Sequence, residues 1–456
     1  MIERDITRKL LDWKQRKNRK PLIIRGARQV GKTWAIENFA KNNFDNFLKI
    51  NLEEQKGLWK IFEKRDTNSI LNELSVFFNT TITAGKTLLF FDEIQAVPEA
   101  IVNLRYFYEQ NQALHIIAAG SLLDHTLNDM KSSMPVGRVE FSNMFPLSFK
   151  EFLYAFGEQR LLDYLQNFKL GDSFSELIHS KALEYIRLYY FIGGMPEAVA
   201  SYLEDKNLID SARVHRSIVS TLQYDFGKYG TRKEQQTLQE VMDFSANNVG
   251  RRFKYISVNE NLRSEEIKTA FQKLSLSRII YLINRTLAGG VPLAAHIKQN
   301  NFKPLFLDIG LVNHIGNIQL VALENLITIN EGALAEQFIG QELLCISDPN
   351  LDPSLFYWSR EARSSNAELD YLFQNNNQIF PIEVKAGKSG TLKSLHVFLQ
   401  EKNLKTGIRF NTDTPSYGQL KARVRTGKSD TEIEYGLLSL PLYLCHRLPE
   451  IIGQVK

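Results

Sequence analysis

Short apolar runs mark three predicted strands in the first part of the chain. They are Leu22–Ile24, Thr87–Phe91 and His115–Ala119. An unbroken apolar run of this length predicts a strand buried on both faces, as in the centre of a parallel sheet. Trp34–Lys41 carries apolar residues at helical spacing instead. The pattern therefore predicts an α/β domain over residues 1–150, built on a parallel sheet.

A phosphate-binding motif lies between the first predicted strand and this helix. The segment GARQVGKT matches the pattern GxxxxGK[ST] at every position. Glycines let backbone N–H groups turn onto phosphate oxygens at a helix N-terminus. We expect Lys32 to contact the β- and γ-phosphates and the Thr33 hydroxyl to hold Mg²⁺. ATP is therefore the expected ligand, held by Gly26, Ala27, Arg28, Gln29, Val30, Gly31, Lys32, Thr33 and Trp34.

Two acids directly follow the second predicted strand. Asp92 can coordinate the Mg²⁺, and Glu93 can polarise the attacking water as a general base. A glutamate at this position favours hydrolysis over phosphoryl transfer to a metabolite. The alternative is that both acids are solvated turn residues.

Two further side chains are candidates for this site. Ser121 follows the third predicted strand and can orient the water or touch the γ-phosphate, or it can cap the next helix; both roles are compatible. Arg138 can act as an arginine finger on a phosphate of its own chain or of a neighbouring subunit. Its alternative is a structural salt bridge.

Composition and charge narrow the class of protein. With 456 residues the chain predicts roughly two to four domains, and its net charge of +5 permits a nucleic-acid partner. Cys345 and Cys445 lack metal-ligand spacing and predict packing thiols in a reducing compartment. We expect no signal peptide and no membrane-spanning segment, hence a cytoplasmic protein. The basic run Lys14–Lys20 is a nucleic-acid arm or a solvated helix face, and we favour the face.

Several segments together resemble a known family. They are IIRGARQVGKT, LLFFDEIQ, AAGSLL, GRVEFSNMFPLSFKEFL and YFIGGMPEAV, in this order. The chain resembles the AAA+ ATPases of the archaeal-type ATPase group, many bacterial members of which carry a C-terminal region known only as a domain of unknown function. The resemblance implies ATP binding and hydrolysis, a helical and winged-helix middle and a nuclease-like end. It also implies homo-oligomers, because a neighbour's arginine commonly completes such sites. By position, it assigns the ATPase residues Lys32, Thr33, Asp92 and Glu93, the sensor Ser121 and the arginine Arg138.

Apolar spacing of three and four predicts helices in the next part of the chain. We expect residues 151–230 to form a helical lid over the nucleotide, although plain packing helices have the same pattern. Residues 231–320 predict a winged-helix domain with a helix beginning at Ser264. Its second helix can enter the major groove of DNA, but winged helices also dock proteins. Lys303–Leu311 predicts a strand and turn with a structural role.

The last part of the chain, residues 321–456, predicts the order α-β-β-β-α-β. The expected elements span residues 330–344, 355–359, 368–373, 379–385, 392–401 and 407–410. Glu383 and Lys385 are two apart on a strand and share one face, and Asp370 can lie beside them. Here the sequence resembles the PD-(D/E)xK nuclease superfamily.

That second resemblance implies a metal-dependent phosphodiesterase. Asp370 and Glu383 match the ligands of Mg²⁺ or Mn²⁺, Glu336 matches the acid of the first helix, and Lys385 matches the residue that positions water. The alternative is a cross-strand salt bridge of Lys385 with Asp370 or Glu383.

Three functions are consistent with these motifs. The first is an ATPase that couples turnover to action on DNA through the winged helix and the nuclease-like domain. The second is an ATP-dependent regulatory switch that binds DNA or protein through a C-terminal domain that does not cleave. A protein-remodelling machine ranks last, because no pore-loop aromatic motif is present.

Overall fold

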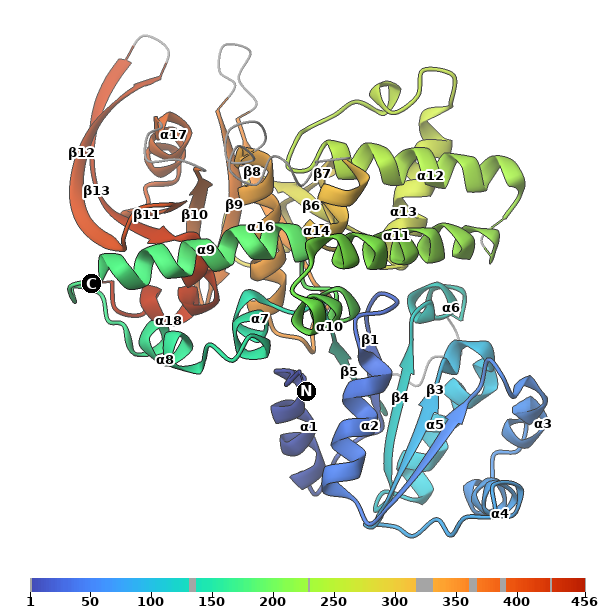
Figure 1. The fold of residues 1–456 in the computed structure, drawn as a ribbon. Coiled ribbons are helices and arrows are strands. Elements are labelled where there is room, and N and C mark those ends of the chain that lie inside the picture. The colour runs from blue at the N-terminus through green and yellow to red at the C-terminus, as the bar shows by residue number, and fades with distance from the viewer. Residues whose placement is uncertain are drawn as a thin grey trace. The chain divides into compact units, whose positions relative to one another are not determined.

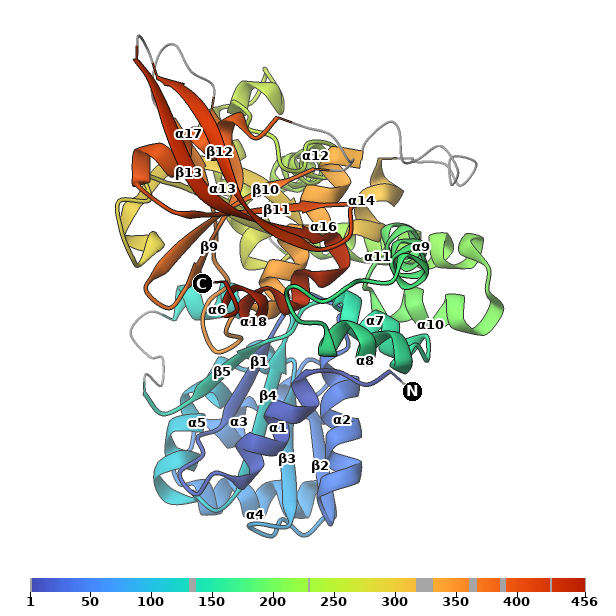
Figure 2. The same cartoon turned by 90° about the vertical axis from the view of Figure 1, so that its left-hand side faces the viewer.

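The computed structural model describes residues 2–130, 137–228, 230–316, 331–360, 367–385, 391–426 and 429–455. This part of the chain forms two compact units. The first comprises Met1–Pro146, Gln272–Ile279 and Asp348–Pro353, and the second comprises Leu147–Phe271, Ile280–Ser347 and Ser354–Lys456. One sheet lies in the first unit, and another runs through the second (Figures 1 and 2).

A five-stranded parallel sheet forms the centre of the first unit, in the order β2-β3-β4-β1-β5. Its strands are β1 (Leu22–Arg25), β2 (Asn46–Asn51), β3 (Thr87–Asp92), β4 (His115–Gly120) and β5 (Glu140–Asn143). β1, β3 and β4 are buried along their whole length, which confirms the three strands predicted from apolar runs. Because the strands run parallel, the loops that follow β1, β3 and β4 meet at one edge of the sheet.

Helices cover both faces of this sheet (Figure 1). α2 packs on one face with α1 against it, and α5 packs on the other with α3 and α4. Their bounds are α1 (Ile6–Gln15), α2 (Lys32–Asn43), α3 (Trp59–Phe62), α4 (Thr67–Phe77), α5 (Pro98–Gln110) and α6 (Leu123–Asp129). The Phe91 ring, on β3, lies 5.5 Å from the Phe62 ring and 6.2 Å from the Phe107 ring, so aromatic packing ties α3 and α5 to the sheet.

The second unit begins with the predicted helices. They are α7 (Phe149–Ala155), α8 (Gln159–Asn167), α9 (Glu176–Ile192), α10 (Pro196–Asp205) and α11 (Leu208–Asp225). Further along follow α12 (Arg232–Asn247), α13 (Ser264–Leu276), α14 (Ile309–Ile315), α16 (Glu331–Ile346), α17 (Lys393–Lys402) and α18 (Leu448–Ile452). None of the helices in the described ranges is long and apolar enough to cross a membrane.

Asp308 joins three of these helices. Its carboxylate accepts hydrogen bonds from the backbone N–H groups of Gly194 (2.6 Å) and Gly310 (2.9 Å), and so links the α9–α10 junction to the start of α14. Asp308 is fully buried. The segment Lys303–Leu311 thus has the strand, turn and structural role predicted for it at this end.

An eight-stranded mixed sheet runs through the second unit, in the order β12-β13-β11-β10-β9-β8-β6-β7. Its strands are β6 (Ile280–Thr286), β7 (Ile297–Phe306), β8 (Leu355–Ser359), β9 (Glu368–Asn375), β10 (Gln378–Val384), β11 (Thr406–Asn411), β12 (Ser416–Thr426) and β13 (Ser429–Pro441). α17 packs against β9 to β12, and α16 packs against β7, β8 and β10. The predicted order α-β-β-β-α-β is present as α16-β8-β9-β10-α17-β11.

The predicted domain boundaries differ from this architecture. β6 pairs in parallel with β8, so one sheet crosses the expected boundary between residues 320 and 321. The hairpin β6–β7, which follows the helix predicted to begin at Ser264, is therefore the edge of the C-terminal sheet and not part of a separate domain. The long pair β12–β13 has no counterpart among the predicted strands.

Two short segments from later in the chain belong to the first unit. In segment 272–279, Ser277 Oγ lies 2.9 Å from His125 Nε2. In segment 348–353, the Pro349 carbonyl accepts a 2.7 Å hydrogen bond from the Asn143 backbone N–H. The first unit is consequently assembled from three stretches, whereas the sequence predicts a single one over residues 1–150.

Candidate active site

The loop 26–33 connects β1 to α2, as the motif requires. Gln29 and Gly31 have φ angles of 63° and 89°, so the loop turns sharply before the helix. A Cβ on Gly26 would lie 2.2 Å from the carbonyl oxygen of Met144, which excludes any side chain there. Consecutive turns of this kind point backbone N–H groups into a concavity that suits an anion.

Lys32 is buried in this concavity. Its Nζ donates hydrogen bonds to the carbonyl oxygens of Gly26 (2.8 Å) and Ala27 (2.7 Å). Burial lowers the pKa of Lys32 to about 8, although the charges of Glu93 and Asp92 act in the opposite direction. Because extra negative charge favours the ammonium form, phosphate groups in the loop would stabilise a protonated Lys32.

Thr33 and Asp92, the two residues expected to hold Mg²⁺, lie in contact. Thr33 Oγ1 donates to Asp92 Oδ2 at 3.1 Å, and Lys49 Nζ lies 3.4 Å from the same carboxylate oxygen. Burial raises the pKa of Asp92, whereas Lys49 and Thr33 act to lower it. A hydroxyl and a carboxylate in contact are oxygen ligands of the kind that Mg²⁺ prefers, so these residues fit that ion.

Glu93 stands at the carboxyl end of β3 in a left-handed conformation, with φ 49° and ψ 48°. Three groups hold its carboxylate. Gln95 Nε2 donates to Oε2 at 2.5 Å, and the backbone N–H and hydroxyl of Ser121 donate to the same oxygen at 3.2 and 3.1 Å. Such conformations persist where surrounding contacts fix them, which is common at functional sites.

These contacts set the charge state of Glu93. Burial raises its pKa, but the hydrogen bond from Gln95, the charge of Lys32 and the N–H of Ser121 together bring the pKa below the ordinary value. Arg28 adds to this effect and donates from Nε to Ser121 Oγ at 3.3 Å. Glu93 is therefore ionised at neutral pH, as a general base must be.

Arg138 lies apart from this group, whereas Trp34 directly follows Thr33. Arg138 precedes β5, at the amino edge of the sheet and opposite the loop 26–33, and its Nε donates to Glu109 Oε1 at 2.9 Å. Within one chain it forms the structural ion pair that was its alternative role. Trp34 lies in the first turn of α2 and its side chain is 42% exposed, so it is not part of the buried core.

Sequence reasoning missed a second ring of residues around the loop. Arg278 Nε donates to Asp124 Oδ2 at 2.6 Å, and Arg25 Nη1 lies 3.5 Å from Asp124 Oδ1 and 2.7 Å from Asp352 Oδ1. Arg25 immediately precedes Gly26. The only local signal was a single arginine at the end of an apolar run. Its partners are far away in the chain: Asp124 lies in α6 and Asp352 in the segment 348–353.

A cluster of charged residues lies in the second unit, where the nuclease motif was predicted. Asp370 Oδ2 accepts a 2.7 Å hydrogen bond from the Val384 N–H, so Asp370 lies beside the strand that carries Glu383. Lys385 Nζ donates to Glu383 Oε1 at 2.5 Å. The pair joins Lys385 to one of the two acids named in the alternative to the nuclease interpretation, but between residues two apart at the end of β10 and not across two strands.

Burial and mutual repulsion raise the pKa values of these acids. The pKa of Glu383 rises to about 7 through burial and the charge of Asp370. Burial raises the pKa of Asp370 against the opposing charge of Lys303, and burial and Asp370 raise that of Glu336 well above its ordinary value. The structure thus brings the four predicted residues Glu336, Asp370, Glu383 and Lys385 into one electrostatic group.

Sequence reasoning missed two members of this cluster. Lys303 is 1% exposed, and its Nζ lies 2.6 Å from Glu368 Oε1 and 4.9 Å from the centre of the Tyr357 ring. Arg252 forms an ion pair with the same carboxylate. A lysine in the apolar run around Pro304 was the available signal, and we predicted only a structural role for that segment.

The cluster does not present an assembled metal site. Over the described ranges, no three side chains of His, Cys, Asp or Glu are arranged to hold a metal ion. Asp370 is engaged by the backbone and Glu383 Oε1 by Lys385. These contacts do not support the predicted Mg²⁺ or Mn²⁺ site of Glu336, Asp370 and Glu383.

Comparison with known families identifies the first unit. Residues 18–153 match the family described as an AAA domain. Residues 183–321 and 331–443 match two families described as domains of unknown function, DUF8612 and DUF4143. The chain therefore contains an AAA-type P-loop domain. No curated protein matches the chain.

Several solved structures are distantly similar to this chain. A Walker-type ATPase of Pyrococcus abyssi is 15% identical, with 69% of this chain and 96% of that chain covered and a TM-score of 0.44. The ORC1 protein of Aeropyrum pernix, solved in complex with DNA, is 11% identical over 69% and 92% of the two chains, with a TM-score of 0.31. The RuvB Holliday junction branch migration motor of Thermotoga maritima is 14% identical over 63% and 91%, with a TM-score of 0.28.

Proposed function

We propose that this chain binds and hydrolyses ATP at the loop 26–33. The observation that carries the proposal is the position of Glu93. Its ionised carboxylate is fixed by Gln95 and Ser121 at the same sheet edge as Lys32 and Asp92. An anion cradle alone would serve binding, whereas an oriented base beside it serves hydrolysis.

Each residue has a defined role in this reaction. The backbone N–H groups of the loop and the ammonium of Lys32 bind the β- and γ-phosphates. Thr33 and Asp92 would hold Mg²⁺, which when bound neutralises phosphate charge. Glu93 accepts a proton from water as the water oxygen attacks the γ-phosphorus and the bond to the ADP oxygen breaks. Ser121 keeps the Glu93 carboxylate in place.

A lysine substitution tests the assignment of the loop. Lys32→Ala removes the cation from the cradle, and Lys41→Ala removes an exposed lysine from the last turn of the same helix. We expect Lys32→Ala to abolish measurable ATP hydrolysis and Lys41→Ala to retain the wild-type rate. Equal rates for the two variants would place hydrolysis elsewhere.

We further propose that Arg138 acts as an arginine finger at the ATP site of a neighbouring subunit. The support is its position at the opposite sheet edge, which no phosphate bound in the loop of the same chain can share. Arg105 is a matched control because it pairs with the same acid, Glu109. Arg138→Ala should lower the turnover number without changing the ATP dissociation constant, whereas Arg105→Ala should change neither. A monomer of full specific activity at every protein concentration contradicts this role.

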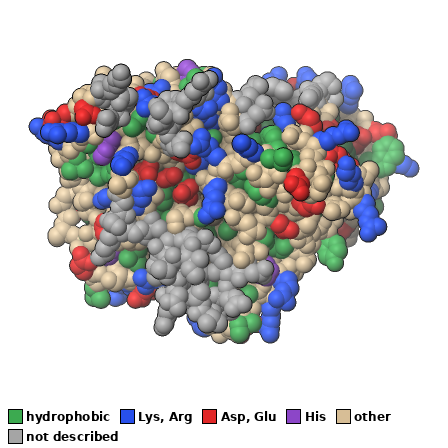
Figure 3. Space-filling model, turned by 90° about the horizontal axis from the view of Figure 1, so that it is seen from above, with side chains coloured by type: hydrophobic (Ala, Val, Ile, Leu, Met, Phe, Trp, Pro, Cys, Tyr) green, Lys and Arg blue, Asp and Glu red, His purple; other side chains and the backbone are tan. Residues whose placement is uncertain are grey.

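Action on DNA is the proposed purpose of turnover. The support is limited to the order of the elements: two helices, α12 and α13, precede the hairpin β6–β7, although this hairpin is the edge of the C-terminal sheet. On the face in Figure 3, however, lysines and arginines are interspersed with acids over the described residues. A mixed surface of this kind favours local contacts over a broad electrostatic footprint.

The charged cluster in the second unit is compatible with two functions, DNA cleavage and binding without cleavage. Glu383 Oε2 is buried and has no hydrogen-bond partner in the described part of the chain, so one oxygen of the cluster is available to a cation, as the nuclease hypothesis requires; the further ligands of such a site are not assembled among the described side chains. The ion pair of Lys385 with Glu383 favours a regulatory switch that binds DNA or protein without cleaving it.

Cleavage assays distinguish these functions. Plasmid and linear DNA are incubated with the protein and Mg²⁺ or Mn²⁺, with and without ATP, beside the Glu383→Ala/Lys385→Ala variant. Cleavage by the wild type alone supports a nuclease controlled by the ATPase. Intact DNA under every condition supports the switch.

A further inference from the structure

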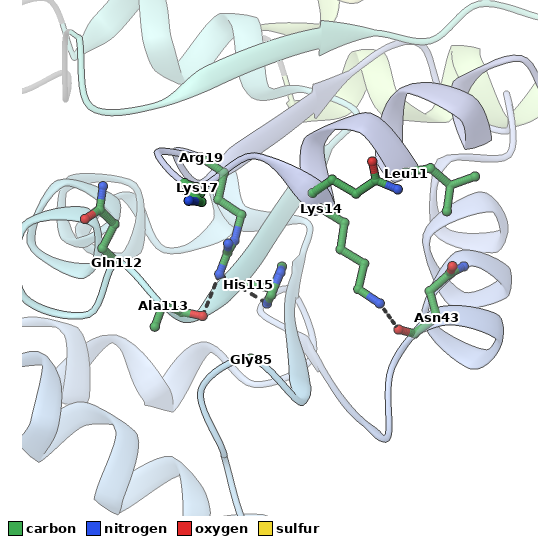
Figure 4. A pocket seen from close by; sticks show the side chains of 10 residues that line it. Leu11, Lys14, Lys17, Arg19, Asn43, Gly85, Gln112, Ala113 and His115 are labelled. Carbon is green, nitrogen blue, oxygen red and sulfur yellow. Dashed lines mark hydrogen bonds between the residues drawn. The ribbon is translucent and has the colours of Figure 1, made fainter.

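A cavity of about 680 Å³ lies in the first unit at the end of α1. Figure 4 shows its lining residues, which are Leu11, Lys14, Gln15, Lys17, Arg19, Asn43, Gly85, Gln112, Ala113 and His115. His115 is the first residue of β4 and Gly85 precedes β3, so the cavity lies at the amino edge of the sheet. The loop 26–33 follows the carboxyl end of β1 and is at the opposite edge.

The charged side chains that line the cavity are all cationic. Lys14, Lys17 and Arg19 belong to the basic run noted in the sequence, and no carboxylate lines the cavity. The helix α1 ends at Gln15, so the later part of this run is a loop and not the helix face that we predicted. Over the described residues, no acid lies within ion-pair distance of these three cations; the neighbouring Arg16 is the one of the run that pairs with an acid, Glu140.

The two deeper cations are held by neutral groups. Lys14 Nζ donates to the carbonyl oxygen of Asn43 and lies 4.5 Å from the centre of the Phe44 ring. Arg19 Nη2 donates to the carbonyl oxygen of Ala113 at 2.6 Å, as the dashed lines of Figure 4 show. These contacts orient the two side chains and leave their positive charge uncompensated.

His115 lies beside Arg19 in the cavity. Its Nδ1 lies 3.4 Å from Arg19 Nη2. Burial, followed by the charge of Arg19, lowers the pKa of His115 to about 4, so the ring is neutral at physiological pH. A neutral ring can accept a hydrogen bond from Arg19 and adds no negative charge to the cavity.

We propose that this cavity binds the phosphate groups of a ligand, at a site separate from the ATP loop. Lys14, Lys17 and Arg19 have no acidic partner among the described residues, so their positive charge is available to phosphate oxygens. The volume of about 680 Å³ exceeds that of one phosphate and lies within the range of small-ligand pockets. The phosphates belong either to a free polyphosphate or nucleotide or to a nucleic-acid backbone. The proposal does not require that the loop 26–33 hydrolyses ATP.

Calorimetry with pyrophosphate tests the site on the full chain. The variants are Lys14→Gln/Lys17→Gln in the cavity and Lys32→Ala in the loop. The control, Lys60→Gln/Lys64→Gln, removes the same charge from exposed positions on and after α3, outside the cavity. We expect two sites in the wild type, of which the cavity variant weakens one by at least about tenfold and Lys32→Ala weakens the other.

The control should bind pyrophosphate as the wild type does. A wild type with one site, lost in Lys32→Ala and unchanged in the cavity variant, overturns the proposal. Equal weakening by the cavity variant and the control also overturns it, because this would reflect net charge alone. Circular dichroism spectra of all variants confirm that a loss of binding is not a loss of fold.

A second titration identifies the source of the phosphate. Fluorescence anisotropy of a labelled single-stranded oligonucleotide is followed with the wild type, the cavity variant and the control. Binding that is lost only in the cavity variant and displaced by pyrophosphate assigns the site to a nucleic-acid backbone. Pyrophosphate binding in the cavity without oligonucleotide binding assigns it to a small phosphorylated ligand.

Discussion

Replacing Gly120 with alanine is expected to slow ATP hydrolysis while ATP still binds. Gly120 is the last residue of β4, and a Cβ there would lie 2.0 Å from Gln95 Oε1. Ordinary contact begins at 3.4 Å, so the Gln95 amide must retreat by about 1 Å or more. The same amide donates the 2.5 Å hydrogen bond that fixes Glu93.

The size of the effect follows from this displacement. A catalytic group misplaced by about 1 Å can cost about a hundredfold in rate, and we expect a decrease of this order in the turnover number. The cost in stability should stay near ~1 kcal/mol, because the clash is with the end of a flexible side chain. The loop and Lys32 are untouched, so the dissociation constant for ATP should not change.

Phosphate-release kinetics and equilibrium ATP binding measure the two quantities separately. Gly57→Ala is the matched control, since a Cβ there meets nothing within 4 Å. Gln95→Ala should reproduce the slow turnover, and the double variant Gly120→Ala/Gln95→Ala should be no slower than Gln95→Ala. A Gly120→Ala chain with the wild-type turnover number would refute the claim that Gln95 positions Glu93.

Other predictions concern the loop and the second unit. Thr33→Ala should weaken Mg²⁺-dependent ATP binding more than binding measured without Mg²⁺, and equal weakening would contradict its assignment. Lys303→Met leaves Glu368 without its buried partner and should lower the free energy of unfolding by about 3 kcal/mol, measured by chemical denaturation. The control Lys421→Met, which removes one partner of an exposed ion pair, should lower it by less than about 0.5 kcal/mol. Equal losses in the two variants would contradict the prediction. Burial raises the pKa of Asp308 from 3.8 to about 6, so its protonated form stabilises the fold below pH 3.8 and that stability is lost as the pH rises to about 6. Between those pH values the wild type should lose about 3 kcal/mol relative to Asp308→Asn in denaturant titrations, and parallel pH profiles would contradict this.

Local sequence carried the prediction of the first unit. The residues expected to contact phosphate come from one continuous loop. The strands β1, β3 and β4 were predictable as apolar runs because both of their faces are buried. Gln95 could not be found this way. Its position depends on the close approach of Gly120 at the end of β4, a residue 25 positions later in the chain.

The second unit shows the same division between local and long-range information. Spacing along one strand was enough to place Glu383 beside Lys385, and their contact is present. Lys303 joins the cluster only because β7 pairs with β6, which in turn pairs with β8. Strand pairing of this kind also crosses the predicted domain boundary, and it leaves no periodic signal in either segment.

Glu93→Gln is the most direct test of the central claim, that Glu93 is the base of an ATP-hydrolysing site. The substitution keeps the shape of the side chain and removes its ability to accept a proton. The measurement is the amount of radiolabelled ATP and ADP bound to the isolated protein after incubation with ATP and Mg²⁺. We predict that Glu93→Gln retains stoichiometric ATP without converting it, whereas the wild type holds ADP. Conversion to ADP at the wild-type rate by Glu93→Gln would contradict the account.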